Sequence, residues 1–455
     1  MSFGDGPDGL LTNKDVSEKS HNQPRMFYGW DIIAALFFAT FLSIGARQGF
    51  GVFVKTWEED WAVSTAAISF AAAIGTLVNG FSQPVFGWLT DKFGGRPVLL
   101  ASFFVTGLAT AGVATISSVL GLMVLYGFII SFSSGGIGFQ TTGVIVARWF
   151  EKKRGVAMAV LVSGGSVGGL VFVPFLSYLL IEVGWQAAWI ITGLIALLIG
   201  IPLLLIVVKS KPDDIGLTID GVDPNSEEGL LGSAAAVGPK FVDKWFDALS
   251  SRPIWQLSFG YFVCGITTTS IAVHFVRWAN SEDITTGTAA LAFGLLSGIN
   301  AAGVLVVGLM SDRFQRKNLL GGVYLVRGLA FLTLIFLPGD IALWAFAVIG
   351  GMSWLATVPL TASLTADVYG VRNLGMLFGL ANMSHAFGGA LAVFLFGWAF
   401  TNWGSYNVPF VVGAITLLAA GVVCLSIREK TNSVRFTRIN QSNELDSGSV
   451  TAGAS

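Results

Sequence analysis

The sequence predicts an all-α membrane protein with twelve transmembrane helices in two six-helix repeats. Hydrophobic residues make up 53% of the 455 residues and charged residues only 12%, whereas about a quarter of a soluble domain is charged. Apolar runs of about 20 residues, the length that spans a bilayer, recur along the chain. A polar motif that follows the second run returns after the eighth run. Together these features predict a duplicated, membrane-embedded helical bundle.

The apolar runs divide the chain into two bundles. In the first half we expect helices at 28–54, 64–90, 98–118, 119–146, 155–180 and 186–208. In the second half we expect them at 254–277, 287–310, 318–337, 341–363, 375–400 and 408–427. The predicted organisation is a disordered cytoplasmic tail (1–27), an N-terminal six-helix bundle (28–208), a cytoplasmic linker loop (209–252), a C-terminal six-helix bundle (253–427) and a second disordered cytoplasmic tail (428–455). Both tails are polar, which predicts disorder, and no signal-peptide core precedes the first helix.

The basic residues predict the orientation of these helices. Of the 26 Lys and Arg residues, only Lys55 and Arg277 would lie on the outer side if both termini were cytoplasmic, while Arg47 and Arg327 fall within spans. Cytoplasmic loops of membrane proteins carry an excess of Lys and Arg. We therefore expect a multi-pass protein of the plasma (inner) membrane with cytoplasmic N- and C-termini.

A loop motif shows the internal repeat. The segment 87–96 (GWLTDKFGGR) returns as 308–317 (GLMSDRFQRK), each time after the second span of a half. A second repeated feature relates Gly155 to Gly375, and its offset along the chain is nearly the same as that of the motif. Parallel repeats of this kind are typical of transporters whose binding sites lie between the halves.

The motif residues predict a contact that opens and closes. Gly87 and Gly308 would let neighbouring helices approach closely. Asp91 and Asp312 would accept charge-assisted hydrogen bonds from Arg side chains or from exposed N–H groups at helix ends. The alternative is that the motif charges only follow the positive-inside rule; two copies in register favour the gating role.

The motif resembles the loop signature G-x-x-x-D-[RK]-x-G-R-[RK] of the major facilitator superfamily. Gly87, Asp91 and Arg96 match it in the first copy. Gly308, Asp312 and Arg316 are the corresponding residues of the second copy, in which Gln315 replaces a Gly. The resemblance implies the major-facilitator fold, and it makes these six matched residues the candidates for conformational gating.

A closer resemblance narrows the group. The run 149–157 (WFEKKRGVA), the segment 45–53 (GARQGFGVF) and the stretch Leu364–Asp367 with Gly375 and His385 resemble the bacterial monocarboxylate-porter and oxalate:formate-antiporter group. Many members of that group place an Arg in the eighth span, where this chain has Val304. An Arg would be the obvious partner of a carboxylate, so the binding site must use other groups.

Polar side chains inside spans are the candidates for such a site, because burying them in a bilayer is costly. Arg47 could receive an organic anion or snorkel towards the interface. His385 could hydrogen-bond a carboxylate, take up a proton, or pack against a backbone carbonyl. Gln140 and Asn300 could contact substrate or join helices. For Arg327, in the ninth span, we expect a structural role.

The favoured function is secondary active transport of a small, monocarboxylate-like organic anion by alternating access. The alternative within transport is export or facilitation of a neutral or amphipathic compound. A membrane enzyme should show clustered catalytic groups, and a sensor should carry an output domain; neither pattern is present. Spans without central carboxylates leave proton symport to a His or to the substrate itself. We expect no metal, no cofactor and no nucleic-acid partner, and a monomer surrounded by lipid.

Overall fold

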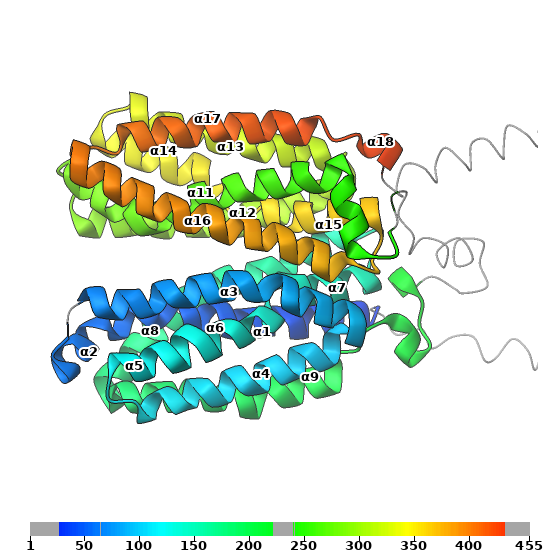
Figure 1. Ribbon diagram of the computed structural model, residues 1–455, viewed down its shortest axis with the longest axis horizontal. Helices are drawn as coiled ribbons and strands as arrows, with labels where there is room; N and C mark the ends of the chain where they lie inside the picture. Colours follow the sequence, from blue (N-terminus) through cyan, green and yellow to red (C-terminus); the bar gives the residue numbers. More distant parts are fainter. Residues whose placement is uncertain (1–26, 64, 222–239, 241, 433–455) are drawn as a thin grey trace, which may run out of the picture.

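The chain folds into helices that run roughly parallel to one another (Figure 1). The computed structural model describes residues 27–63, 65–221, 240 and 242–432. Among these residues every regular element is helical, as the sequence predicts. The predictions for most of both tails and for the middle of the linker concern residues outside this range.

The two halves have similar series of helices. The first comprises α1 (Gly29–Gln48), α2 (Val54–Trp61), α3 (Thr65–Phe93), α4 (Gly95–Gly112), α5 (Val119–Leu122), α6 (Ser131–Ser133), α7 (Phe139–Trp149), α8 (Arg154–Ile195) and α9 (Ile201–Val207). The second comprises α11 (Arg252–Ser281), α12 (Thr286–Ser311), α13 (Arg316–Phe336), α14 (Gly339–Gly351), α15 (Thr357–Tyr369), α16 (Leu374–Trp403), α17 (Asn407–Leu425) and the short α18 (Glu429–Asn432). Between α5 and α7 the chain forms a π-helical segment, η3 (Met123–Ile130), and a 3-10 turn, η4 (Ser134–Ile137).

Twelve spans can be traced through these helices. Nine helical stretches in the described part of the chain are long and apolar enough to cross a membrane, and they count Arg154–Val207 once. Gly184 interrupts that stretch with φ 81° and ψ 167°, so it holds the fifth and sixth spans. The nine do not include α3, which is the second span, or the tenth span, which is divided into α14 and α15.

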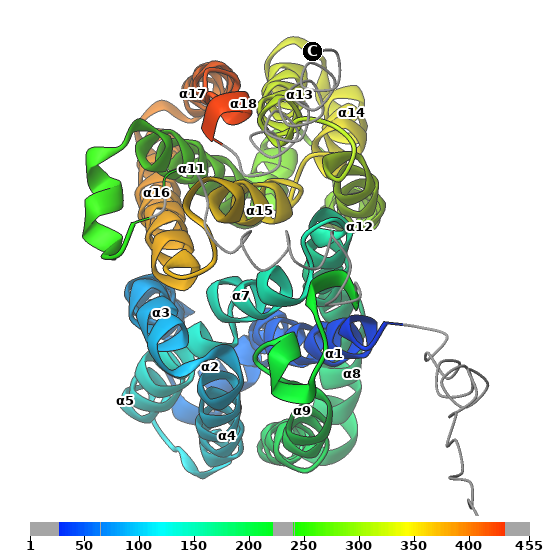
Figure 2. The same cartoon turned by 90° about the vertical axis from the view of Figure 1, so that its right-hand side faces the viewer.

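The helices form two groups that meet along two seams. Figure 2, which looks along the helices, shows α1–α9 in one group and α11–α18 in the other. Across the boundary α3 packs against α16 and α8 packs against α12. At one end, Tyr28 at the start of α1 donates to the Val207 carbonyl at the end of α9 over 2.8 Å. The short α18 lies at the same end (right in Figure 1).

Glycines show that the sequence repeat is also a repeat in packing. A Cβ atom on Gly168 of α8 would collide with the Phe41 carbonyl of α1, and one on Gly388 of α16 would collide with the Phe262 carbonyl of α11. The second pair follows the first at nearly the offset of the loop motif. Small residues let membrane helices approach until their backbones touch. The same close crossing therefore holds each half together.

This crossing predicts a stability difference between two Gly→Ala changes. Gly168→Ala should lower the melting temperature in detergent by several degrees, because overpacking a tight contact costs about 1–3 kcal/mol. Gly322 of α13 is the matched control, since a Cβ atom there meets nothing within 4 Å. Gly322→Ala should leave the melting temperature equal or higher, because Ala favours helix over Gly. Equal melting temperatures for the two variants would contradict the close crossing.

Candidate functional site

The two carboxylates of the repeated motif join the halves at the end of the molecule where α18 lies. Asp91, near the end of α3, accepts hydrogen bonds from the N–H groups of Gly375 and the next residue at 2.9 and 2.8 Å. Asp312, directly after α12, accepts from the N–H groups of Gly155 and the next residue at 2.8 and 3.1 Å. Both acceptors meet the first turn of a helix, where free N–H groups and the helix dipole favour an anion.

The motif glycines lie in the same contacts. A Cβ atom on Gly87 would collide with the backbone of Gly375, and one on Gly308 would lie against Ala159 and the backbone of Gly155. The first copy of the motif therefore docks on the start of α16, and the second copy docks on the start of α8. The part of these residues in gating stays a prediction.

The two motif arginines differ in their placement. Arg316 lies at the boundary and donates from Nη1 to Asp367 Oδ2 over 2.5 Å and from Nη2 to Asp312 Oδ1 over 3.4 Å. Arg96 instead donates from Nη2 to the Leu205 carbonyl over 2.7 Å, within its own half. The structure thus brings Arg316, but not Arg96, into the contact between the halves.

A buried carboxylate that sequence reasoning missed lies between two arginines. Asp367 of α15 is 2% exposed. It accepts from Arg316 of its own half and, over 2.8 Å, from Nη1 of Arg154 in the other half. Breaking a buried pair by removing one partner is strongly destabilising, because the remaining charge is uncompensated. In the sequence, Arg154 belongs to a basic run and Asp367 to a stretch that resembles the porter group. No sequence feature predicts that the two side chains pair.

A carboxylate after the last span completes this network. Glu429 of α18 accepts from the backbone N–H groups of Arg316 and Lys317 at 3.0 and 2.8 Å, and so caps the start of α13. Burial raises the pKa of Glu429, and the two backbone hydrogen bonds act in the opposite direction. The start of α13 is therefore fixed from outside its own helix.

The fourth and tenth spans are both broken, at corresponding places in the two halves. In the fourth span Gly138, with φ −63° and ψ 173°, separates η4 from α7. In the tenth span the segment 352–356 separates α14 from α15. Interrupted segments at matching places in two repeats indicate a binding region, because irregular backbone in a membrane lies where it borders a cavity or is buried in protein.

Two of the predicted binding residues satisfy the backbone at these breaks. Gln140, fully buried, donates from Nε2 to the Gly135 carbonyl. Asn300 of α12 accepts from the N–H of Leu355 over 2.9 Å and donates to Ser166 Oγ of the other half over 3.3 Å. In this conformation both groups of the Asn300 amide are bonded to protein, as expected for an amide that joins helices. Gln140 Oε1 is buried without a hydrogen-bond partner in the described part of the chain.

Arg47 faces a cavity inside the first half. Its Nη1 donates to Ser134 Oγ over 3.5 Å, and it also interacts with the Tyr126 hydroxyl. The volume of the cavity that admits the centre of a water molecule is about 40 Å³. Its lining is mostly apolar and aromatic, with a few hydroxyls: Leu42, Ser43, Ala46, Arg47, Phe103, Thr106, Thr110, Tyr126, Ile130, Ser134, Ile137, Phe172, Trp189, Thr192 and Ala196. None of the ion pairs among the described residues involves Arg47.

His385 of α16 lies in the second half beside α11. Its Nε2 is 3.2 Å from Thr268 Oγ1, and its ring centre is 5.5 Å from that of Tyr261. The next residue, Ala386, would touch a Cβ atom placed on Gly80 of α3. His385 is therefore half-buried and close to the α3–α16 seam.

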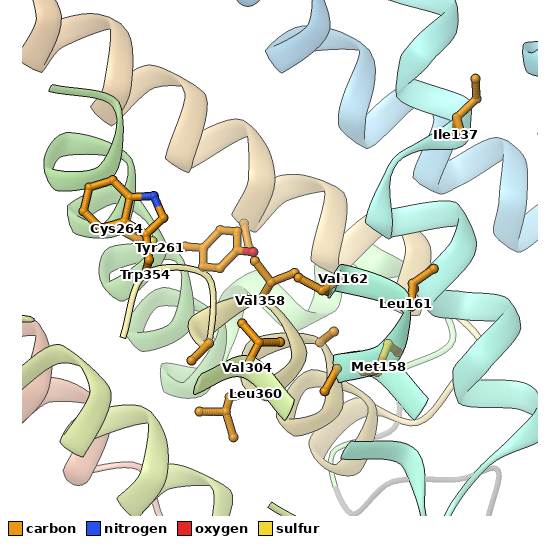
Figure 3. Packing of buried hydrophobic residues seen from close by; sticks show 14 of the residues in the cluster. Ile137, Met158, Leu161, Val162, Tyr261, Cys264, Val304, Trp354, Val358 and Leu360 are labelled. Atoms are coloured by element: carbon orange, nitrogen blue, oxygen red, sulfur yellow. The ribbon is translucent and has the colours of Figure 1, made fainter. Parts of the chain in front are cut away.

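Val304 does not leave an empty space at the position where the resemblance leads us to expect an Arg. It is 1% exposed and belongs to the apolar core. Figure 3 shows it in the region of Val358 and Leu360 of α15 and of Val162 of α8. No group of three or more His, Cys, Asp or Glu side chains in the described part of the chain could hold a metal ion.

Curated relatives cover most of the chain at low identity. The oxalate:formate antiporter of Oxalobacter formigenes is 26% identical over 408 residues, which is 87% of this chain and 90% of that protein. Monocarboxylate transporter 13 of Bos taurus is 26% identical over 88% of this chain and 89% of that protein. The probable sulfoacetate transporter of Cupriavidus necator is 24% identical over 87% and 93%.

Solved structures show the same fold. The human organic anion transporter MFSD10 superposes with a TM-score of 0.67 at 18% identity, covering 88% of this chain and all of that one. The E. coli fucose:proton symporter, in the outward conformation, gives a TM-score of 0.64 at 16% identity over 86% of this chain and 97% of that one. The family model described as Major Facilitator Superfamily matches residues 36–392 and 257–447. With the repeated motif, the paired breaks and these matches, the chain belongs to the major facilitator superfamily of membrane transporters.

Proposed function

We propose that the protein is a secondary active transporter that moves a small, monocarboxylate-like organic anion across the plasma membrane by alternating access. The observation that carries this proposal is Arg47, a cation on the wall of a cavity without a carboxylate partner among the described residues. An isolated charge within a span is costly unless a ligand or another group compensates it. An organic anion would supply the missing charge.

The relatives support the same substrate class. The names of three of them refer to oxalate and formate, to monocarboxylates and to sulfoacetate, all of which are organic anions at neutral pH. Because Val304 replaces the expected Arg of the eighth span, the anion would bind nearer the first half than it would with that Arg. His385 would face it from the second half, with Gln140 and Asn300 released from the broken spans as the halves move.

The contacts between the halves support alternating access. If both termini are cytoplasmic, as the basic loops predict, then Asp91, Asp312 and Asp367 hold the cytoplasmic side closed. Each contact joins a side chain of one half to a helix start or side chain of the other. Rotation of one half against the other would break all three together, and the boundary between the halves would then open to the cytoplasm.

The apolar wall of the cavity supports the alternative function, transport of a neutral or amphipathic compound. Phe103, Phe172 and Trp189 line the cavity beside Arg47, a surface that would also suit a neutral or amphipathic compound. A thermal-shift screen of the purified protein separates the two readings, because a ligand that binds the folded state raises its apparent stability. Stabilisation by neutral amphipathic compounds and by no organic acid would favour the alternative.

Removal of the Arg47 charge should weaken binding of the anion found in that screen. Arg47→Gln should raise its Kd by about 10- to 100-fold, because a hydrogen bond to a charged group contributes about 1.5–3 kcal/mol. Counterflow in proteoliposomes should fall in parallel. Arg277→Gln is the control, since Arg277 is exposed and stacks on Phe400 with 4.7 Å between the guanidinium carbon and the ring centre. Unchanged uptake of every tested carboxylate by Arg47→Gln would contradict the proposal.

Neutralising the motif carboxylates should shift the protein towards the cytoplasm-open state. Asp91→Asn and Asp312→Asn each weaken charge-assisted bonds to two N–H groups, worth about 1–3 kcal/mol. Pulsed electron paramagnetic resonance between spin labels at Phe93→Cys and Phe314→Cys, both more than half exposed, should show added long distances.

A surface carboxylate provides the control for the distance measurement. Asp213→Asn removes an exposed carboxylate whose partner is Lys211 at 3.5 Å, so it should leave the distance distribution unchanged. Cys264 and Cys424 are both buried and should not take up label. If Asp91→Asn and Asp312→Asn gave the distances of the unmodified motif, the carboxylates would not act as a gate.

A further inference from the structure

A second buried arginine lies in the other half of the molecule. Arg327 of α13 is 0% exposed. It donates to the carbonyls of Ser353 and Trp354, in the break between α14 and α15, and from Nη1 to Cys264 Sγ over 3.1 Å. No ion pair among the described residues includes Arg327. Since a guanidinium stays charged in a protein, this cation needs a compensating negative charge nearby.

Cys264 is the group in contact that can supply that charge. Cys264 is 2% exposed. Its Sγ also lies 3.3 Å from Thr357 Oγ1 of α15. A thiol ionises more readily than a phenol in water, and a neighbouring guanidinium or imidazolium favours the thiolate.

The other titratable groups around this position come from four helices. Tyr261 is on α11 with Cys264, Tyr324 is on α13 with Arg327, His385 is on α16 and Cys424 is on α17. From α15 the neighbour is the hydroxyl of Thr357, and α12 carries no charged residue between Ala289 and Met310. The Tyr324 hydroxyl and Arg327 Nε are buried without a hydrogen-bond partner in the described part of the chain.

His385 links this buried cluster to the boundary between the halves. Its imidazole interacts with the Cys264 sulfur and hydrogen-bonds Thr268, which in turn donates to the Cys264 carbonyl over 2.7 Å. Unlike Cys264, it is half-buried. Two residues further on, Phe387 packs on Phe81 of the other half with ring centres 5.2 Å apart. His385 therefore lies between the seam and the Cys264 sulfur.

We propose that Cys264 and Arg327 form a buried thiolate–guanidinium pair, and that Cys264 with His385 is the proton-binding site that couples proton movement to anion transport. In the transfer an N–H bond of protonated His385 breaks and an S–H bond forms on Cys264. No atom is oxidised or reduced. The coupling role rests on the proposed function, whereas the ion pair does not.

The electrostatics explain why proton and anion would bind together. While Cys264 is a thiolate, it neutralises Arg327. When Cys264 takes up a proton, the charge of Arg327 is uncompensated and favours binding of an anion. By linkage, a bound anion favours protonation of Cys264 to the same extent. The site thus replaces the central carboxylate that the spans lack.

Infrared spectroscopy of the S–H stretch tests the ion pair directly, because the chain has only two cysteines. Cys424→Ala leaves Cys264 alone; its S–H band should be absent at neutral pH and appear on acidification. Cys264→Ala is the control, because it leaves only Cys424, a buried thiol for which the described structure shows no hydrogen bond to a cation. The S–H band of Cys424 should persist across the same pH range. A persistent S–H band for Cys264 at neutral pH would overturn the pair.

Transport in proteoliposomes tests the coupling. Cys264→Ala and Cys264→Ser should lose accumulation of the organic acid driven by an inward proton gradient but retain counterflow, while Cys424→Ala should keep both. Retained counterflow shows that the variants are folded. Gradient-driven accumulation by Cys264→Ser would overturn the coupling. A protein that carries no organic acid yet lacks the Cys264 S–H band would refute the proposed function and the coupling, and would leave the ion pair standing.

Discussion

The dominant constraint on this molecule is that a membrane offers no water to backbone N–H and C=O groups. A broken span is therefore stable only where other groups satisfy the freed backbone. Gln140 does this for the fourth span, and Asn300 and Arg327 do it for the tenth. The polar residues buried in the two halves are thus explained first by the breaks. The breaks are where the chain departs from the regular helix that hydropathy alone would give.

The same constraint explains the reciprocal form of the contacts between the halves. The first turns of α8 and α16 have N–H groups without partners inside the helix. Each is supplied by a carboxylate from the opposite half, Asp312 in one case and Asp91 in the other. Because the two halves repeat one arrangement of helices, a contact in one direction comes with its counterpart in the other. The contacts between the halves therefore form a matched pair.

Hydropathy and the repeated motif predict the all-α fold, the twelve spans and the carboxylates at the seam. They do not predict the break at Gly138 or the turn at 352–356, since both segments remain apolar and hydropathy does not report the path of the backbone. They also miss the pair of Arg154 and Asp367, which joins residues far apart in the chain. They do not predict that Arg96 bonds the Leu205 carbonyl within its own half either. A motif specifies residue types, whereas the tertiary fold determines which partners those residues meet.

The repeat finally explains how one scaffold presents two kinds of chemistry. Gly45 and Gly265 occupy corresponding positions of the repeat, and each lies at a close crossing of the first and fifth spans of its half. Just beyond that crossing the first half carries Arg47, whereas the second half carries Thr267 at the corresponding position, followed by Thr268. Thr268 holds His385 rather than a ligand. The halves therefore share a backbone and differ in charge, with an open cation in the first and a cation enclosed with a thiol in the second. That difference gives a symmetric scaffold an asymmetric site. In the proposed function, such a site would let one half bind the anion while the other half responds to it.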